Sequence, residues 1–265
     1  MTTTYDCTAA DQRAEGLENA QRAIRQHKCV VFPTDTVYGI GADAFSPQAV
    51  TMLLASKGRS RKMPPPVLIP RLNALDGLAT DVPAEARKLA EAFWPGGLTM
   101  IFHAQPSLDW DLGETRGTVA LRMPADDVAQ DLLTLTGPLA VSSANRTGQP
   151  AARTAAEAMA QLAESVEVYL EGGLRPEGDA DSDALPSTIV DATALPLRVV
   201  RQGAIALERL REVVPELLDI DGNAAVPAAD VPAADPEAAP APGDEPAKTP
   251  EPAKNAESVT GPGAE

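Results

Sequence analysis

The sequence has few of the side chains that enzymes use as nucleophiles or metal ligands. Among its 265 residues are only two cysteines and two histidines. Cys7 and Cys29 show neither the spacing of a zinc site nor a disulfide framework, and no ligand pattern surrounds His27 or His103. An idle or buried thiol in a reducing compartment is the simplest interpretation of each cysteine.

Several nucleotide-binding and hydrolase motifs are absent as well. No Gly-x-x-x-x-Gly-Lys phosphate loop occurs. Ser142 and Ser143 do not lie in a Gly-x-Ser-x-Gly elbow. The segment 39–41 has two glycines of a dinucleotide fingerprint, but Ala44 stands where the third would be. If the protein is an enzyme, we therefore expect it to work by binding and electrostatics.

Long apolar segments are missing too. No run approaches the roughly 20 residues that cross a bilayer. The stretch from Met1 to Asp11 is polar and lacks the apolar core of a signal peptide. We therefore expect a cytoplasmic protein without a membrane segment.

Charge and composition divide the chain into two parts. The net charge is −16, and residues 219–265 hold 10 acidic and 2 basic residues, 13 alanines, 9 prolines and no aromatic residue. Such a segment cannot bury enough apolar surface to offset its ordering entropy. We predict a folded domain over 1–218 and a disordered acidic tail over 219–265. Because the folded part is itself acidic, any anion must meet a local cationic site.

Strand and helix patterns alternate along the folded part. Helices are expected at Thr8–His27, 47–57, from Pro83 to about Phe93, Asp126–Leu135, Thr154–Ala163 and Leu207–Val213. Apolar runs predict strands at Cys29–Phe32, Val67–Ile69, Leu98–Phe102, Thr118–Leu121, Leu139–Ser142, Val166–Leu170, Thr188–Val190 and Leu197–Val200. This mixture predicts an α/β fold in a single domain with a mixed sheet.

Two motifs carry most of the chemistry. The segment 33–41, Pro-Thr-Asp-Thr-Val-Tyr-Gly-Ile-Gly, follows a strand end, where α/β proteins place ligands, although an ordinary glycine-containing turn is an equal alternative. The segment 57–62 has four cations in six residues at a helix end. Its guanidinium and ammonium groups suit phosphate or carboxylate, although a solvated basic loop is the simpler interpretation. Just past Gly58, we expect Arg59 to be exposed.

Three weaker motifs follow at the ends of other strands. Arg122 closes one strand, where a surface ion pair is as common as a ligand clamp. In the segment 140–148 a buried strand runs directly into small polar residues, which suits close backbone approach to a ligand, or a capped loop. The segments 187–191 and 201–203 are weak individually.

Together with 94–99, these motifs resemble the YrdC family of threonylcarbamoyl-adenylate synthases over roughly residues 20–205. The resemblance lies in Pro-Thr-[Asp/Glu]-Thr-Val-Tyr-Gly, Lys-x-Arg, Ser-x-Ala-Asn, Ser-Thr-Ile-Val-Asp and Arg-x-Gly, in this order. It implies a twisted mixed sheet with a charged concave site. It also implies a nucleotidyltransferase that converts L-threonine, bicarbonate and ATP to threonylcarbamoyl-AMP and pyrophosphate, with magnesium accompanying ATP. Partner transferase proteins would then modify tRNA, which this chain would meet only indirectly.

The resemblance also assigns roles to residues, and it implies no metal ligands. It implies that threonine is held by Thr36, Arg122 and Ser187, and ATP by Lys57, Arg59, Thr118, Ser143, Asn145 and Arg201. Lys57 and Arg59 would neutralise phosphate during catalysis.

The sequence departs from the family pattern at two places, and two alternative functions stay open. Ser60 follows Arg59, and Leu68 stands where many members have a histidine that contributes to threonine binding. One alternative is an RNA-binding module, which the acidic charge disfavours. The other is a carbamoyl transferase domain related to hydrogenase maturation proteins, whose zinc-finger and acylphosphatase modules have no counterpart here.

Overall fold

The structure is a computed structural model that describes residues 2–178 and 185–225. The predicted tail therefore lies mostly outside the described residues, and its disorder stays a prediction. At its start, residues 219–223 form a turn in which the amide of Asp219 donates to the carbonyl of Asn223 at 2.9 Å.

Every predicted helix and strand is present, with ends shifted by a few residues. The helices are α1 (Ala10–Arg25), α2 (Pro47–Lys57), α3 (Leu75–Leu78), α4 (Ala84–Phe93), α5 (Asp127–Thr136), α6 (Ala155–Leu162) and α7 (Leu207–Val213). The strands are β1 (Thr3–Asp6), β2 (Val30–Phe32), β3 (Gly39–Asp43), β4 (Val67–Leu68), β5 (Ala79–Thr80), β6 (Leu98–Ala104), β7 (Thr118–Arg122), β8 (Leu139–Ser143), β9 (Val168–Glu171), β10 (Thr188–Asp191) and β11 (Arg198–Arg201).

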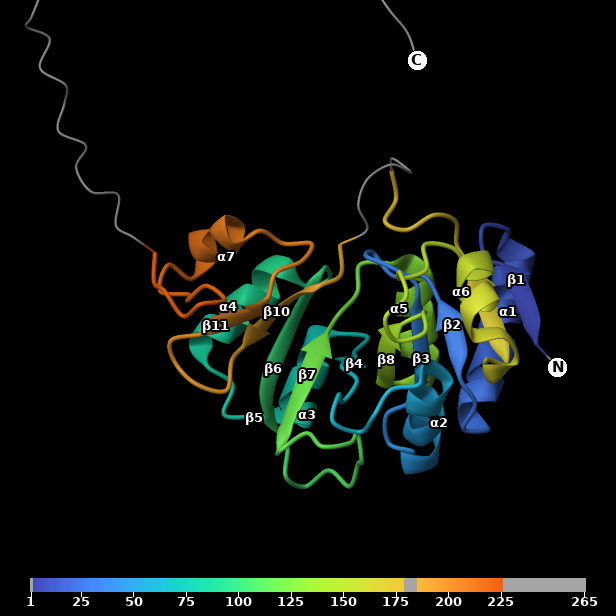
Figure 1. The fold of residues 1–265 in the computed structure, drawn as a ribbon, viewed down its shortest axis with the longest axis horizontal. Helices are drawn as coiled ribbons and strands as arrows, with labels where there is room; N and C mark the ends of the chain where they lie inside the picture. Colours follow the sequence, from blue (N-terminus) through green and yellow to red (C-terminus); the bar gives the residue numbers. More distant parts are fainter. Residues whose placement is uncertain (1, 179–184, 226–265) are drawn as a thin grey trace, which may run out of the picture. The chain divides into compact units, whose positions relative to one another are not determined.

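The strands form one sheet in the order β1-β9-β2-β3-β8-β4-β7-β6-β10-β11, with β5 paired to β6 (Figure 1). Pairs such as β4 with β7 and β6 with β10 are parallel, whereas β3 with β8 and β6 with β7 are antiparallel. The predicted single α/β domain with a mixed sheet is confirmed.

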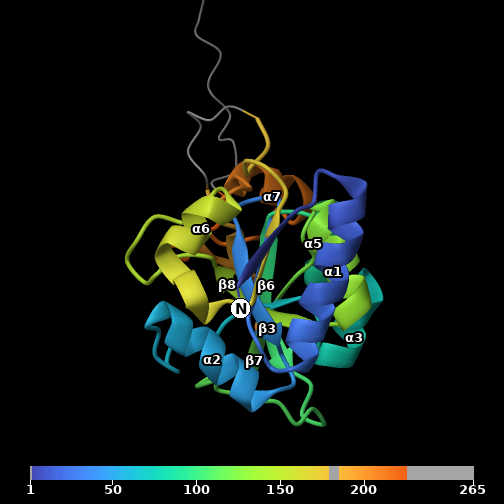
Figure 2. The same ribbon diagram turned by 90° about the vertical axis from the view of Figure 1, so that its right-hand side faces the viewer.

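Alternate residues of the central strands feed two apolar cores, as the period of two in a strand requires. In β9, for example, Tyr169 packs in one core, whereas Val168 and Leu170 pack in the other. The helices α1 and α5 cover one face and α2 and α6 the other (Figure 2). The core beneath α1 and α5 contains no residue of β6, β7 or β10, so this face of those strands is left for other use.

Local signals set the ends of α2. The Ser46 hydroxyl accepts from the amide of Ala49 at 3.2 Å, and Pro47 is the first helical residue. Gly58 ends the helix with φ of 63°, a left-handed conformation that favours glycine. The basic segment 57–62 therefore starts at a fixed point.

The main difference from the predicted elements is β3, which takes in the last three residues of the 33–41 segment, where no strand was predicted. Gly39 and Gly41 lie in this strand and pair with Ser143 and Val141 of β8. A glycine-rich strand has almost no local signature, because its stability comes from its neighbours. The first six residues of the motif, 33–38, remain a loop at the strand end.

Candidate active site

A cavity of about 300 Å³ lies over the face of β6, β7 and β10 that neither core fills. Side chains of one strand face line it, including Thr99 and Ile101 of β6 and Thr118 and Ala120 of β7. Its rim comes from the loop 64–66 and from the ends of β8 and β10. Seven of the residues that the sequence assigned to substrates line this cavity: Thr36, Arg59, Thr118, Arg122, Ser143, Ser187 and Arg201.

Arg122 is buried at the end of β7 and is held on three sides. Its Nε donates to the carbonyl of Gly96 at 3.0 Å, its Nη1 to the Thr36 hydroxyl at 2.9 Å, and its Nη2 to the Asp35 carboxylate at 2.6 Å. The surface ion pair that a strand-end arginine could have made is instead a partly buried one. The guanidinium is therefore fixed in orientation.

The two threonines of the 33–41 segment have defined donor and acceptor roles. The Thr34 hydroxyl donates to the carbonyl of Val37 at 2.6 Å. Its single proton is thereby used, and its oxygen accepts from the amides of Thr36 and Val37, each at 3.3 Å, and lies 3.1 Å from the Thr36 hydroxyl. With Arg122 donating to it, the Thr36 oxygen has one lone pair left for a ligand N–H or O–H.

A second polar network lies around Ser187. Arg201 donates to the Ser187 carbonyl from Nε at 3.1 Å and from Nη2 at 2.7 Å, and to its hydroxyl at 3.0 Å. The Ser187 hydroxyl also lies 2.8 Å from that of Thr99. Gly203 is required nearby, because a Cβ there would lie 2.1 Å from the carbonyl oxygen of Pro186. The segments 187–191 and 201–203, weak individually, thus form one unit.

Arg59 is half-buried, and the expectation that it is exposed is wrong. Its Nη1 donates to the Ser142 hydroxyl at 2.8 Å, and its Nε is buried without a partner among the described residues. The Arg59 side chain reaches the end of β8, although Ser60 and Arg61 beside it are exposed. A buried N–H without an acceptor is unfavourable by about 1–3 kcal/mol, so the placement of Arg59 is not explained by stability alone.

Three guanidinium groups, those of Arg59, Arg122 and Arg201, therefore meet at one cavity, and no acidic residue lines it among the described residues. Burial lowers the pKa of Arg201, and repulsion from Arg122 and Arg59 lowers this pKa further. Burial also lowers the pKa of Arg122, against the opposing effect of Asp35. This excess of positive charge favours an anionic ligand.

Lys57 and Asn145 do not line the cavity. The Lys57 side chain is only 4% exposed, and its ammonium donates to the backbone carbonyls of Ser143 and Asn145. Burial, followed by repulsion from Arg59, lowers the pKa of Lys57 to about 8. The Asn145 amide donates to the carbonyls of Arg146 and Gln149 at 2.9 and 2.7 Å. Both side chains thus bond to backbone carbonyls of the 143–149 turn and stabilise it.

Other residues of the site carry no predicted role. Thr34, Thr99 and Ser142 contribute hydroxyls, and none of them was assigned from the sequence. Leu68, which replaces the family histidine, is buried and lines the cavity, so an apolar side chain is present there. The sequence shows Ser142 beside Ser143, but it does not show that the Ser142 hydroxyl contacts Arg59.

The described residues contain no group of three or more histidine, cysteine, aspartate or glutamate residues placed to hold a metal ion. No helix among them has both the length and the apolar character that crossing a membrane requires.

Comparison with known proteins identifies the class to which this fold and cavity belong. Residues 22–203 match the Sua5/YciO/YrdC family, described as "Telomere recombination". The chain belongs to this family. Its synthase-like motifs are therefore those of a recognised protein class.

Individual relatives point to one activity within the family. A Mycobacterium tuberculosis protein with the provisional name threonylcarbamoyl-AMP synthase is 47% identical over 214 residues, which cover 81% of this chain and 96% of the relative. The threonylcarbamoyl-AMP synthase of Pyrococcus abyssi is 35% identical over 195 residues, 73% of this chain and 56% of the relative.

A solved structure shares the fold. The P. abyssi Sua5 structure described as complexed with L-threonine superposes with a TM-score of 0.71 and 34% identity. The match covers 77% of this chain and 58% of that one. The chain is thus similar in fold to a protein that binds threonine.

Proposed function

We propose that this protein synthesises threonylcarbamoyl-AMP from L-threonine, bicarbonate and ATP, releasing pyrophosphate. The observation that carries the proposal is the meeting of Arg59, Arg122 and Arg201 at one cavity without an acidic lining residue. The carboxylate of threonine, bicarbonate and the phosphates of ATP are all negatively charged, which such a cavity favours. The names of the relatives and the threonine complex of Sua5 support the same substrate.

The proposed reaction needs no protein nucleophile, which agrees with the scarcity of nucleophiles in the sequence. Bicarbonate takes up a proton and loses water to give CO2. The threonine amine attacks the carbon of CO2 and loses a proton, which gives a carbamate. A carbamate oxygen then attacks the α-phosphorus, and the bond to the β-phosphate oxygen breaks with its electron pair on pyrophosphate. The protein contributes orientation and positive charge.

Each end of threonine has a matching group in the cavity. A carboxylate suits the unused N–H donors of Arg122. The remaining lone pair of Thr36 suits the amine or hydroxyl, and the Ser187–Thr99 hydroxyl pair adds a second polar contact. Arg59 lines the same cavity, and its guanidinium suits a phosphate oxygen.

The residues do not form a metal site of their own, since the described cavity lining includes no carboxylate. Magnesium that enters with ATP would be held by phosphate oxygens and water, which is the ligand set it prefers. Delivery of the product to partner transferase proteins and tRNA belongs to the same proposal.

The test is an omission experiment. Pyrophosphate release is measured with ATP, threonine and bicarbonate together, and then with each of the last two left out. We expect release only in the complete mixture. Equal release without threonine or without bicarbonate would refute the assignment. Transfer of a carbamoyl group from carbamoyl phosphate would instead favour the carbamoyl transferase alternative.

A further inference from the structure

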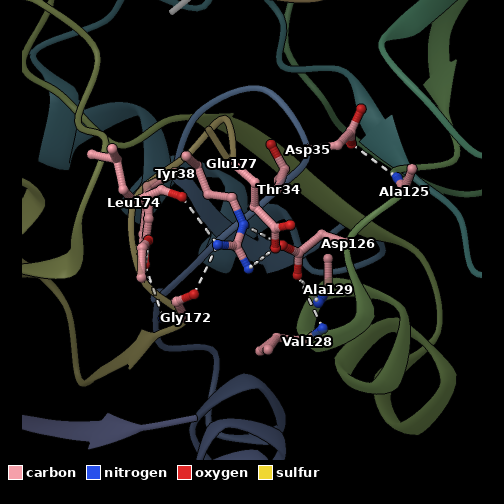
Figure 3. Close-up of polar contacts among 12 residues, drawn as sticks. Thr34, Asp35, Tyr38, Ala125, Asp126, Val128, Ala129, Gly172, Leu174 and Glu177 are labelled. Atoms are coloured by element: carbon pink, nitrogen blue, oxygen red, sulfur yellow. Dashed lines mark hydrogen bonds and ion pairs between the residues drawn. The ribbon is translucent and has the colours of Figure 1, made fainter. Parts of the chain in front are cut away.

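Asp35 braces the guanidinium of Arg122 against the backbone. Its Oδ1 accepts from Arg122 Nη2 at 2.6 Å and from the amide of Ala125 at 2.9 Å. Figure 3 shows the Asp35 carboxylate directed at Ala125. One oxygen thus ties the end of the arginine side chain to the segment that follows its own strand.

The contacts of Arg122 leave a defined part of it free. A guanidinium has five N–H donors, and Gly96, Thr36 and Asp35 accept from one on each nitrogen. One N–H therefore remains on each terminal nitrogen, and Arg122 lines the cavity. Two donors on one planar group are what a carboxylate accepts in a bidentate contact.

Asp35 makes this contact from outside the substrate cavity. Its side chain is 18% exposed and lines a second cavity of about 600 Å³, together with Asp126, Arg175 and Glu177. It does not line the cavity to which Arg122 points. A ligand can therefore meet Arg122 without displacing Asp35 or being repelled by direct contact with its carboxylate.

We propose that Asp35 is a positioning residue that orients the two free N–H donors of Arg122 toward the carboxylate of the amino-acid substrate. This inference rests on the proposed function. Without the Asp35 acceptor, only Gly96 and Thr36 hold the guanidinium, and Nη2 loses its fixed partner. The loss then falls on recognition of the carboxylate and leaves the phosphate contacts of Arg59 in place.

Steady-state pyrophosphate release by Asp35→Ala and Asp35→Asn tests the inference. We expect Asp35→Ala to raise the KM for threonine about tenfold or more, the effect of losing one charge-assisted hydrogen bond. The KM for ATP should change by less than about twofold. Asp35→Asn keeps an oxygen in the Oδ1 position and should recover most of the threonine affinity.

A substrate analogue isolates the carboxylate. L-threonine amide lacks the negative charge and should inhibit the wild-type chain far more weakly than threonine binds it. In Asp35→Ala this discrimination should shrink, which a general loss of folding would not produce. Unchanged discrimination in Asp35→Ala would overturn the inference.

The matched control is Asp126→Asn. Asp126 is buried and accepts from Arg175 Nε at 2.7 Å, so this change removes the charge of a second aspartate–arginine pair, also beside the second cavity. Because Asp126 makes no hydrogen bond to Arg122, the threonine KM of this variant should stay near the wild-type value even if its stability falls. An equal rise in this control, or no recovery in Asp35→Asn, contradicts the inference. An inactive wild-type chain refutes the proposed function instead.

Discussion

Lys57, the last residue of α2, donates a hydrogen bond from its ammonium to the backbone carbonyl of Asn145, 88 positions later. The same ammonium also bonds to the carbonyl of Ser143. A conspicuous cation of the basic loop thus supports the 143–149 turn, and Arg59 is left as the cation of that loop that lines the cavity.

The pKa of Lys57 makes a prediction about stability. Because this pKa is lowered from 10.5 to about 8 in the folded chain, the unfolded state binds more protons between these values. The contribution of Lys57 to the free energy of unfolding therefore rises as pH increases from about 8 to about 10.5. We expect the stability difference between wild type and Lys57→Met, measured by urea unfolding, to shift in favour of wild type between about pH 7.5 and about pH 9. A difference that does not change with pH would contradict the lowered pKa.

Arg59→Ala should reduce kcat/KM by about a hundredfold. A hydrogen bond to a charged group contributes about 1.5–3 kcal/mol, and each ~1.4 kcal/mol is a factor of ten. Arg59→Lys should recover only part of the activity, because an ammonium keeps the charge but not the planar fork. Stability should change by no more than about 1 kcal/mol, since the lost bond to Ser142 is offset by removal of the unpartnered Nε.

Arg61→Ala is the matched control for Arg59. Arg61 lies two positions later in the same basic loop, but its side chain is 51% exposed and pairs with Asp111 at 2.6 Å. Its removal should leave kcat/KM within about twofold of wild type, as for a surface site. Equal losses in the two variants would show that the loop acts through diffuse positive charge.

Removal of residues 226–265 should leave pyrophosphate release and Tm nearly unchanged, because the composition of the segment cannot support a packed core. Ending the chain at Leu218 should lower Tm. It removes the carbonyls of Ile220 and Asn223, which accept from Arg198 at 2.6 Å and Arg211 at 2.9 Å. Thermal unfolding of both truncated chains checks this. A large loss of activity on removing 226–265 alone would show that this segment serves the site.

The chain should bind tRNA weakly. Within the basic loop, Arg59 faces the cavity and Arg61 is paired with Asp111, while the chain as a whole is strongly acidic. We expect a dissociation constant no tighter than about 10⁻⁶ M at physiological salt, the range of non-specific binding. Pyrophosphate release should not depend on tRNA. Tight binding, or strong stimulation by tRNA, would favour the RNA-binding alternative.

The sequence by itself determined the features that depend on neighbours along the chain. The cap at Ser46, the first-turn Pro47 and the C-terminal Gly58 fixed α2, and short apolar runs located most strands, because these preferences act within one turn or one strand. The order of the motifs determined the family. Of the nine residues assigned through this resemblance, seven line one cavity.

Only the tertiary structure decided which residues line the substrate cavity. Lys57 and Asn145 do not line it, and Asp35 bonds to Arg122 from a second cavity. The hydroxyls of Thr99 and Ser187 meet across 88 residues, and Arg59 reaches Ser142 across 83. The physical reason is that strands distant in sequence become neighbours in the sheet, and the packing around a side chain, which no local pattern records, decides whether its charge faces a ligand or the backbone.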